Sequence, residues 1–230
     1  MLLAIDTSSL VLSCALAEED RLVAEWTVQR KLTHSEQLIP HMDTMMREAG
    51  VSKSEIEAIA VSVGPGSFTG LRIGLATAKM ASYIWKVPLM GVDTLEALAW
   101  NMAGARAFIL PLLDAQRGNV YAALYGAFDE MWQEEKEEVA PIDEVIAAAV
   151  KHGGPLIAVG ECADKYKDKL LAAGIMPAPP HSRLSRAGSV ALAGFGKLKS
   201  GRIDNPLSIL PNYIRRSEAE VLWEKRHPES

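Results

Sequence analysis

Short apolar runs and amphipathic segments alternate along the chain, a pattern typical of an α/β protein. The first run, residues 2–5, is wholly apolar and stops at the polar turn Asp6-Thr7-Ser8-Ser9. Two further strands are expected over 10–17 and 21–29, joined by the acidic turn 18–20. The pattern therefore predicts an antiparallel three-stranded start.

Helical spacing begins directly after these strands. Thr33 and Glu36 have the spacing of a capping box and open a helix that runs to about Ala49. Pro40 inside this helix removes a backbone hydrogen bond, so we expect a bend there. The other elements expected in the first half are a strand over 56–63, a helix over 71–85, a strand over 86–92 and a short helix over 94–102.

The order of elements then begins again near Gly104. An apolar strand over 108–113 runs into Asp114, as residues 2–5 run into Asp6, and a second strand follows over 119–127. The stretch 129–138 contains six acids and one lysine, which indicates a solvated edge rather than a site. The remaining expected elements are helices over 142–150, 163–173 and 187–199, a strand over 155–159, and a proline-rich loop near 177–180.

A glycine-rich segment, Gly64 to Gly74, joins a predicted buried strand to a predicted helix. Such a turn can receive an anion or the backbone of another chain. It is not a Walker A loop, because Leu71-Arg72 follows Gly70 where lysine and a hydroxyl residue are needed, and the spacing G-x-G-x-x-G is not matched either. The alternative is a turn whose glycines permit positive φ and close packing.

The segment Gly64 to Gly74 resembles the signature segment of the TsaB (YeaZ) family, which supplies a subunit of the bacterial tRNA threonylcarbamoyladenosine machinery. The resemblance implies an α/β fold of two RNase H-like lobes, the actin-like ATPase (ASKHA) fold. We place an amino-terminal, partner-binding lobe at 1–103 and a carboxyl-terminal lobe at 104–230, with the tail packing back on the first lobe. Agreeing stretches are residues 5–8, 34–40, 114–121 and 211–216.

The resemblance also implies a function. It predicts a non-catalytic scaffold or activating subunit that pairs with a TsaD-like transferase and works with a TsaE-like ATPase. The complex modifies the tRNA adenosine next to the anticodon, and this chain meets tRNA only through the complex. Without its partner the chain is expected to form a homodimer through the same face, which the helices over 34–49 and 71–85 provide.

The expected partner interface lies on these two helices and on the glycine segment. A charge substitution at Met45 or Leu75 should abolish pairing and leave the monomer folded. The interface residues are His34, Leu38, Met42, Met45, Gly66, Phe68, Thr69, Arg72 and Leu75.

Three segments match nucleotide-binding positions of ASKHA proteins. Asp6-Thr7-Ser8 corresponds to the phosphate turn whose acid holds magnesium through water, although an Asx-type turn closing a hairpin is the alternative. Asp114 resembles the second phosphate loop without its glycine, and Gly160 falls at the adenosine turn, with Cys162 where a glycine is usual. We expect no cofactor to be required, and ATP or ADP with magnesium at a vestigial or intersubunit site stays open.

Motifs for catalysis and metal binding are incomplete. His34 and His41 are seven residues apart, about 10 Å along a helix, too far to share a zinc ion. Ser67 has no local base and does not stand in a Gly-x-Ser-x-Gly pattern. We therefore expect neither catalytic residues nor a metal site. The rival hypothesis is an enzyme, either an ATP-binding hydrolase or a glycoprotein endopeptidase-like protein, and an ASKHA kinase is disfavoured by the short chain.

Composition narrows the choice of partners and compartment. The chain has 230 residues, 49% of them hydrophobic, and a net charge of −5. A protein that grips nucleic acid alone usually carries clustered positive charge, so tRNA contact is expected to be shared with a partner. Cys14 and Cys162 lack paired spacing and indicate buried thiols in a reducing compartment. The amino terminus has no basic leader, so we expect no membrane contact and a cytoplasmic protein.

Overall fold

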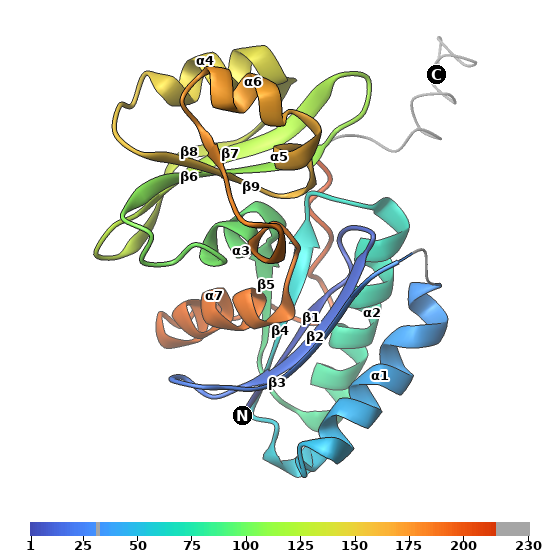
Figure 1. Cartoon of the computed structure of the whole chain (residues 1–230). Helices are drawn as coiled ribbons and strands as arrows, with labels where there is room; N and C mark the ends of the chain where they lie inside the picture. Colours follow the sequence, from blue (N-terminus) through green and yellow to red (C-terminus); the bar gives the residue numbers. More distant parts are fainter. Residues whose placement is uncertain (31–32, 215–230) are drawn as a thin grey trace, which may run out of the picture.

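The computed structural model describes residues 1–30 and 33–214, and within them the chain forms two lobes, each built on a five-stranded mixed sheet (Figure 1). Residues 215–216 of the 211–216 motif lie outside the described residues. Among the described residues, no helix combines the length and the apolar character needed to cross a bilayer.

The first lobe has the strand order β3-β2-β1-β4-β5. β1, β2 and β3 are antiparallel neighbours, as expected, and β4 and β5 add parallel to β1. Its elements are β1 (Leu2–Asp6), β2 (Val11–Ala17), β3 (Leu22–Gln29), α1 (His34–Glu48), the short 3₁₀ turn η1 (Lys53–Glu55), β4 (Ala58–Gly64), α2 (Phe68–Trp85), β5 (Leu89–Asp93) and α3 (Thr94–Trp100).

The second lobe repeats this topology, with the order β8-β7-β6-β9-β10. Again the first three strands pair antiparallel and the last two add in parallel. The repeat confirms the predicted two-lobed fold class. Its elements are β6 (Ala107–Asp114), β7 (Asn119–Ala127), β8 (Met131–Pro141), α4 (Ile142–Val150), β9 (Leu156–Val159), α5 (Glu161–Lys165), α6 (Lys167–Ala172), β10 (Met176–Pro177), the 3₁₀ turn η2 (Pro180–Ser182) and α7 (Ala187–Lys199).

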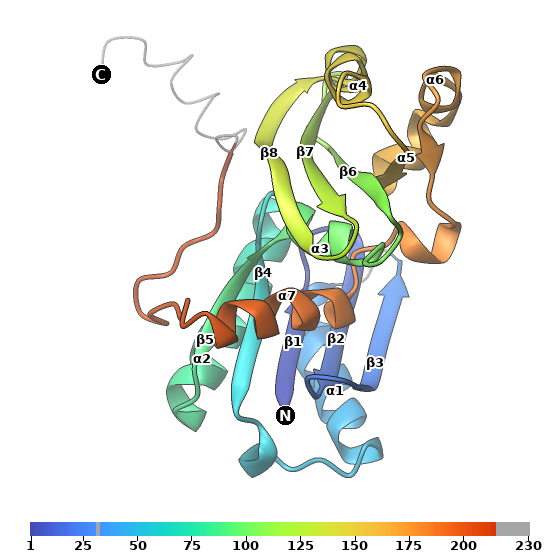
Figure 2. The ribbon, with the colours of Figure 1, turned by 90° about the vertical axis from the view of Figure 1, so that its left-hand side faces the viewer.

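Helices cover both faces of the first sheet (Figures 1 and 2). α1 and α2 pack on one face, where Leu38 and Leu75 join a core with Ile5 and Val61. The opposite face is covered by α7, whose small residues lie on the alanines of β1, β2 and β4. Although α7 falls in the range 104–230 assigned to the second lobe, it therefore packs on the first sheet.

The two lobes are joined through the helices between their sheets. α3, which follows the last strand of the first sheet, lays Leu95 and Leu98 against Tyr121 and Tyr125 of the second sheet. α3 and α7 also contact each other. α3 and α7 thus form the layer between the two sheets (Figure 1).

Several local details differ from the sequence-based expectations, among them the strand β8 in the acidic stretch where only a solvated edge was expected. α2 begins at Phe68 rather than at residue 71, because Ser67 caps it by accepting a hydrogen bond from the Gly70 backbone N–H at 3.2 Å. The Thr33 side chain makes no capping bond, so the expected capping box is not formed. The helix expected over 163–173 is two short helices that meet at Tyr166.

Candidate functional site

A cleft of 480 Å³ opens between the lobes, beyond the carboxyl ends of the central strands β1, β4 and β6. Ligands of open α/β sheets bind at this edge, because the loops that follow the strands meet there. The cleft is lined by Ser8, Ser9, Leu10, Pro65, Gly66, Ser67, Phe68 and Thr69 from the first lobe, by Leu113, Asp114, Ala115, Gln116, Tyr121 and Glu161 from the second, and by Asn212, Tyr213 and Ile214.

The turn that follows β1 is closed by its own hydrogen bonds. One Asp6 carboxylate oxygen accepts bonds from the Ser8 backbone N–H at 2.9 Å and from the Ser8 hydroxyl at 2.8 Å. The other accepts a bond from the Ser62 hydroxyl at 2.6 Å. Asp6 is fully buried and does not line the cleft.

Gly66, Gly70 and Gly74 of the glycine-rich segment let the start of α2 pack closely against this turn. A side chain at Gly66 would collide with the Ser8 carbonyl, and one at Gly70 or Gly74 would collide with Thr7. The close approach permits two direct bonds, from the Ser67 N–H to the Ser8 carbonyl and from the Thr7 hydroxyl to the Gly70 carbonyl, each 2.7 Å long. In this chain the glycines therefore serve close packing.

Burial governs the charge of Asp6. Removal from water raises the pKa of its carboxyl group above the usual value, and the bonds from Ser62 and Ser8 oppose that rise. The carboxylate is enclosed and its bonds go to groups of the protein itself. The turn therefore does not fit a magnesium ion and phosphate held through Asp6.

The second predicted nucleotide segment lies partly in the cleft. Asp114 lines it, pairs with the Lys165 ammonium at 2.9 Å, and donates its backbone N–H to Glu161 at 3.1 Å. Gly160 lies behind the cleft wall with φ of 93°, where a side chain would collide with the Leu112 carbonyl. Of the predicted nucleotide residues, the structure places Ser8 and Asp114 at the cleft and Asp6, Thr7 and Gly160 behind it.

Aromatic rings and an arginine gather at the mouth of the cleft. The Phe68 and Tyr213 rings stack with their centroids 4.9 Å apart. The Arg72 guanidinium lies 3.9 Å from the centroid of the Phe68 ring and donates to the Tyr213 hydroxyl at 2.9 Å. This contact ties α2 to the carboxyl-terminal segment and gives Arg72 an intramolecular role.

The structure corrects part of the interface prediction. Leu38, Met42, Met45 and Leu75 are buried in the core of the first lobe, because β1, β2 and β4 present an apolar face to α1 and α2. A charge there would disrupt the lobe itself, so the substitutions named above cannot report on pairing alone.

The other predicted interface residues lie at or near the cleft rather than in the core. Phe68 and Thr69 line the cleft with Gly66, and a ring nitrogen of His34 lies 3.0 Å from the Ser9 carbonyl oxygen. His41 stacks on Trp26, with the ring centroids 3.5 Å apart, and does not meet His34. Within residues 1–30 and 33–214, no group of three or more histidine, cysteine or acidic side chains could hold a metal ion.

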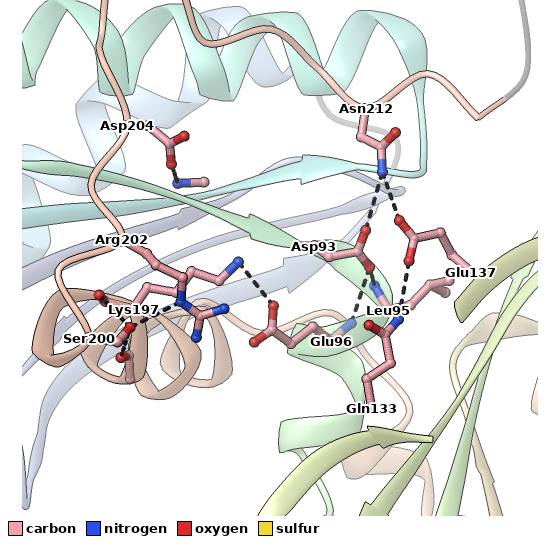
Figure 3. A network of polar contacts seen from close by, with 12 residues as sticks. Asp93, Leu95, Glu96, Gln133, Glu137, Lys197, Ser200, Arg202, Asp204 and Asn212 are labelled. Carbon is pink, nitrogen blue, oxygen red and sulfur yellow. Dashed lines mark hydrogen bonds and ion pairs between the residues drawn. The ribbon is translucent and has the colours of Figure 1, made fainter. Parts of the chain in front are cut away.

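A polar network beside the cleft was missed by sequence reasoning. Asp93 at the end of β5, Glu137 on β8 and Asn212 converge there from three distant parts of the chain (Figure 3). The one sequence signal was the motif around Asn212, whereas Glu137 was included in a stretch predicted to be a solvated edge.

Two repeated sheets with a cleft at their strand ends define the class of actin-like α/β proteins. The ROK hexokinase of Thermus thermophilus shares this fold, with a TM-score of 0.54 and 13% identity over 87% of this chain and 99% of that one.

Sequence and structure together then identify the family. A family model described as "TsaD: tRNA N6-adenosine threonylcarbamoyltransferase" matches residues 28–199. The tRNA threonylcarbamoyladenosine biosynthesis protein TsaB of Bacillus subtilis is 31% identical over 96% of this chain and 97% of the relative. A Pseudomonas aeruginosa structure, described as an uncharacterized protein with similarity to peptidase YeaZ, superimposes with a TM-score of 0.78 and 28% identity over 93% of this chain and 99% of that one. The chain belongs to the TsaB (YeaZ) family, within the wider group that the TsaD model describes.

Proposed function

We propose that this chain is a non-catalytic subunit that pairs with a TsaD-like transferase, together with a TsaE-like ATPase, in threonylcarbamoyl modification of the tRNA adenosine next to the anticodon. The Bacillus subtilis relative, named for tRNA threonylcarbamoyladenosine biosynthesis, supports the pathway. The net charge of −5 supports tRNA contact through the complex rather than by this chain alone.

The observation that carries the pairing proposal is an exposed apolar surface on α2. Met80, Tyr83 and Ile84 are 60%, 63% and 62% exposed, although each has a large apolar side chain. On the neighbouring helix α1, Ile39 is also 61% exposed. Clustered apolar side chains on the outside of a helix mark a protein–protein contact, because burying them against a partner removes apolar surface from water.

The hydroxyl and thiol groups that could serve as nucleophiles in an enzyme have structural roles or are buried. The Ser67 hydroxyl caps α2, and burial raises the pKa of both the Cys14 and the Cys162 thiols to about 12, which leaves little thiolate at neutral pH. These observations favour the scaffold over the peptidase-like and hydrolase alternatives, although the Pseudomonas aeruginosa protein is described by its similarity to a peptidase.

We further propose that the chain needs no nucleotide of its own. The support is the Asp6 turn, where Ser8 and Ser62 already satisfy the carboxylate and where α2 fills the space against Thr7. A nucleotide bound by the complex would then be held by groups on the cleft side, such as Asp114, and by the partner.

The same α2 surface would form a homodimer when the transferase is absent. A symmetric dimer uses one patch twice, so a patch that fits a homologous two-lobed partner also fits a second copy. The two pairings would then compete for one surface, and the transferase would displace the homodimer.

The test of the pairing proposal is a titration of the chain against its purified TsaD-like partner. Met80→Asp and Ile84→Asp each place a charge in the proposed contact and touch no buried core. We expect each to weaken binding at least about 30-fold, the loss that corresponds to a hot-spot side chain of about 2 kcal/mol.

Leu171→Asp is the matched control, since Leu171 is an exposed apolar residue, 42% exposed, on α6 of the other lobe. It should bind as the native chain does, and all three variants should melt within about 2 °C of it, as surface substitutions usually do. Undiminished binding by both α2 variants would overturn the assignment of this surface.

A further inference from the structure

The chain from Ile203 to Ile214 runs across the first lobe, with one turn at 206–208, and we call this segment the strap. Its Asp204 pairs with the edge strand β5, donating its backbone N–H to the Leu89 carbonyl and accepting the Gly91 N–H on its carboxylate, each at 2.8 Å. The Lys79 ammonium of α2 then holds the Ile209 carbonyl at 3.0 Å. The strap is thus fastened to the first lobe along its length.

At its far end the strap reaches the second lobe. The Asn212 backbone N–H donates to the Val63 carbonyl at 2.7 Å, and Gly64 makes this approach possible because a side chain there would meet the Asn212 carbonyl at 2.5 Å. Two residues on, Ile214 packs against the apolar cluster in which α3 meets the second sheet. The last described residues of the strap therefore bridge the lobes and form one wall of the cleft.

The Asn212 side chain makes the polar part of this bridge. Its amide nitrogen lies 3.5 Å from a carboxylate oxygen of Asp93 in the first lobe and 3.3 Å from one of Glu137 in the second. Figure 3 shows the amide above both carboxyl groups, which converge on it from opposite lobes. One neutral donor group thus faces two acids.

The local fold sets the positions of both acids. The other Asp93 oxygen caps α3, accepting the Leu95 and Glu96 N–H groups at 2.8 and 3.3 Å. Glu137 stands at a bulge of β8, where the register slips between the partners of Ala122 and Leu124. A bulge redirects a side chain, and here the half-buried Glu137 faces the other lobe although its neighbours on β8 are mostly exposed.

Among residues 1–30 and 33–214, the charged or titratable neighbours named for Asp93 are acidic or neutral, with one cation close by. Glu137 comes from β8, Glu96 from α3 and the Tyr125 hydroxyl group from β7. Glu96 is paired with Lys197 of α7 at 3.2 Å, so that cation is already engaged. Glu137 also accepts a bond from the Gln133 amide at 3.2 Å. Burial, and next the charge of Glu137, raise the pKa of Asp93 to about 7.

We propose that the strap is a proton-operated latch between the lobes: Asn212 holds Asp93 and Glu137 together while Asp93 keeps its proton, and the strap end leaves this site when both acids are charged. The proton passes to water, and no other group is consumed. Once Asp93 is ionised, two half-buried negative charges share a single neutral amide, and their repulsion favours separation.

The direction of the pH effect follows from linkage. In the closed arrangement Asp93 binds its proton more tightly than it does when exposed to water, so closure is favoured at low pH and lost as the pH rises through about 7. With one proton released per opening, the opening equilibrium rises by up to about tenfold per pH unit below that midpoint, and it levels off above it, where Asp93 is ionised in both states.

The test is hydrogen exchange of the strap peptide in the full chain at pH 6 and pH 8, corrected for the intrinsic rate of exchange. In the native chain we expect the opening equilibrium to rise by up to about tenfold between the two pH values, most of it below pH 7. Glu137→Gln keeps the side-chain shape and removes one charge, so its strap should stay protected at both pH values, with less than about a twofold change. Asp93→Asn should likewise be insensitive to pH, and Asn212→Ala should exchange quickly at both.

Glu138→Gln is the matched control, because Glu138 is the next acid on β8 and lies on the opposite, α4 side of the sheet. It should keep the full pH response of the native chain. Strap exchange that does not change with pH in the native chain, or a Glu138→Gln variant that loses the response as Glu137→Gln does, would overturn the latch. Melting curves of all variants separate these results from global unfolding.

Discussion

The packing of α2 on the Asp6 turn makes a sharp prediction about Gly74. In an exposed helix, replacing glycine by alanine stabilises a protein by up to about 1 kcal/mol, because alanine has less backbone entropy to lose. At Gly74 the added methyl group would instead collide with the Thr7 hydroxyl and reach the Ile5 side chain at 3.6 Å. Thr7 cannot turn away freely, since its hydroxyl donates to the Gly70 carbonyl at 2.7 Å.

The net effect follows from these opposing contributions. Overpacking of a close-packed site costs about 1–3 kcal/mol, and loss of a buried hydrogen bond costs about 1 kcal/mol more. After the gain in helix propensity is subtracted, Gly74→Ala should destabilise the chain by about 1–3 kcal/mol, which lowers Tm by several degrees at this size.

Gly196→Ala is the control, because Gly196 lies within the last turn of α7 and a side chain there meets nothing within 4 Å. This variant should be unchanged or stabilised by up to about 1 kcal/mol. Urea unfolding followed by circular dichroism measures both. If Gly74→Ala were as stable as Gly196→Ala, the close seating of α2 on Thr7 would not exist in solution.

Three further predictions concern buried polar groups. Ser62→Ala removes the 2.6 Å bond to the buried Asp6 carboxylate and should cost about 1–3 kcal/mol of unfolding free energy, measured by urea titration. Glu25→Gln breaks the ion pair with Arg186 that holds the start of α7 and weakens the bond from the Gly188 N–H, so a loss of about 1–3 kcal/mol is expected in the same assay. The pKa of Asp93 is raised from 3.8 to about 7 in the folded chain, so its contribution to stability is complete below about pH 4 and is lost as the pH rises towards 7. Asp93→Asn should remove this decline, gaining stability relative to the native chain by up to about 1.4 kcal/mol per pH unit across that range, and an unchanged pH profile of Tm would contradict the assignment.

Sequence periodicity predicted most of the elements. The helices at 142–150 and 187–199 have the expected bounds. The strand order repeats in the two lobes, as the family resemblance implied for the two strand-first halves. Local signals sufficed for this because buried strands are short and apolar and because proline marks the start of α4.

What could not be predicted depends on long-range packing. The apolar residues of α7 show that it is buried but not which sheet buries it. An apolar helix face has the same sequence pattern whether it packs on its own sheet or on a partner. Met42 and Leu75 were therefore assigned to the partner interface, although both are buried in the lobe. The sequence pattern did not distinguish Met80 as an exposed residue. The strap has no periodicity, because single contacts such as those of Asp204 and Asn212 hold it in place.

Part of the site was predictable from local signals, because its loops follow recognisable strands. Ser8, Gly66 and Asp114 stand where strands end, as the strand–turn patterns indicated, and the structure brings them to one cleft. The enclosure of Asp6 by Ser62 and by α2 could not be read from spacing, since it depends on how two strands and a helix pack together.

The most direct test of the proposed function is modification of unmodified tRNA by a purified TsaD-like transferase and TsaE-like ATPase with a threonylcarbamoyl donor, in the presence or absence of this chain. The account predicts that modification is lost when the chain is omitted or carries Met80→Asp and Ile84→Asp together, and that it is retained with Leu171→Asp. Full modification without the chain would contradict the account.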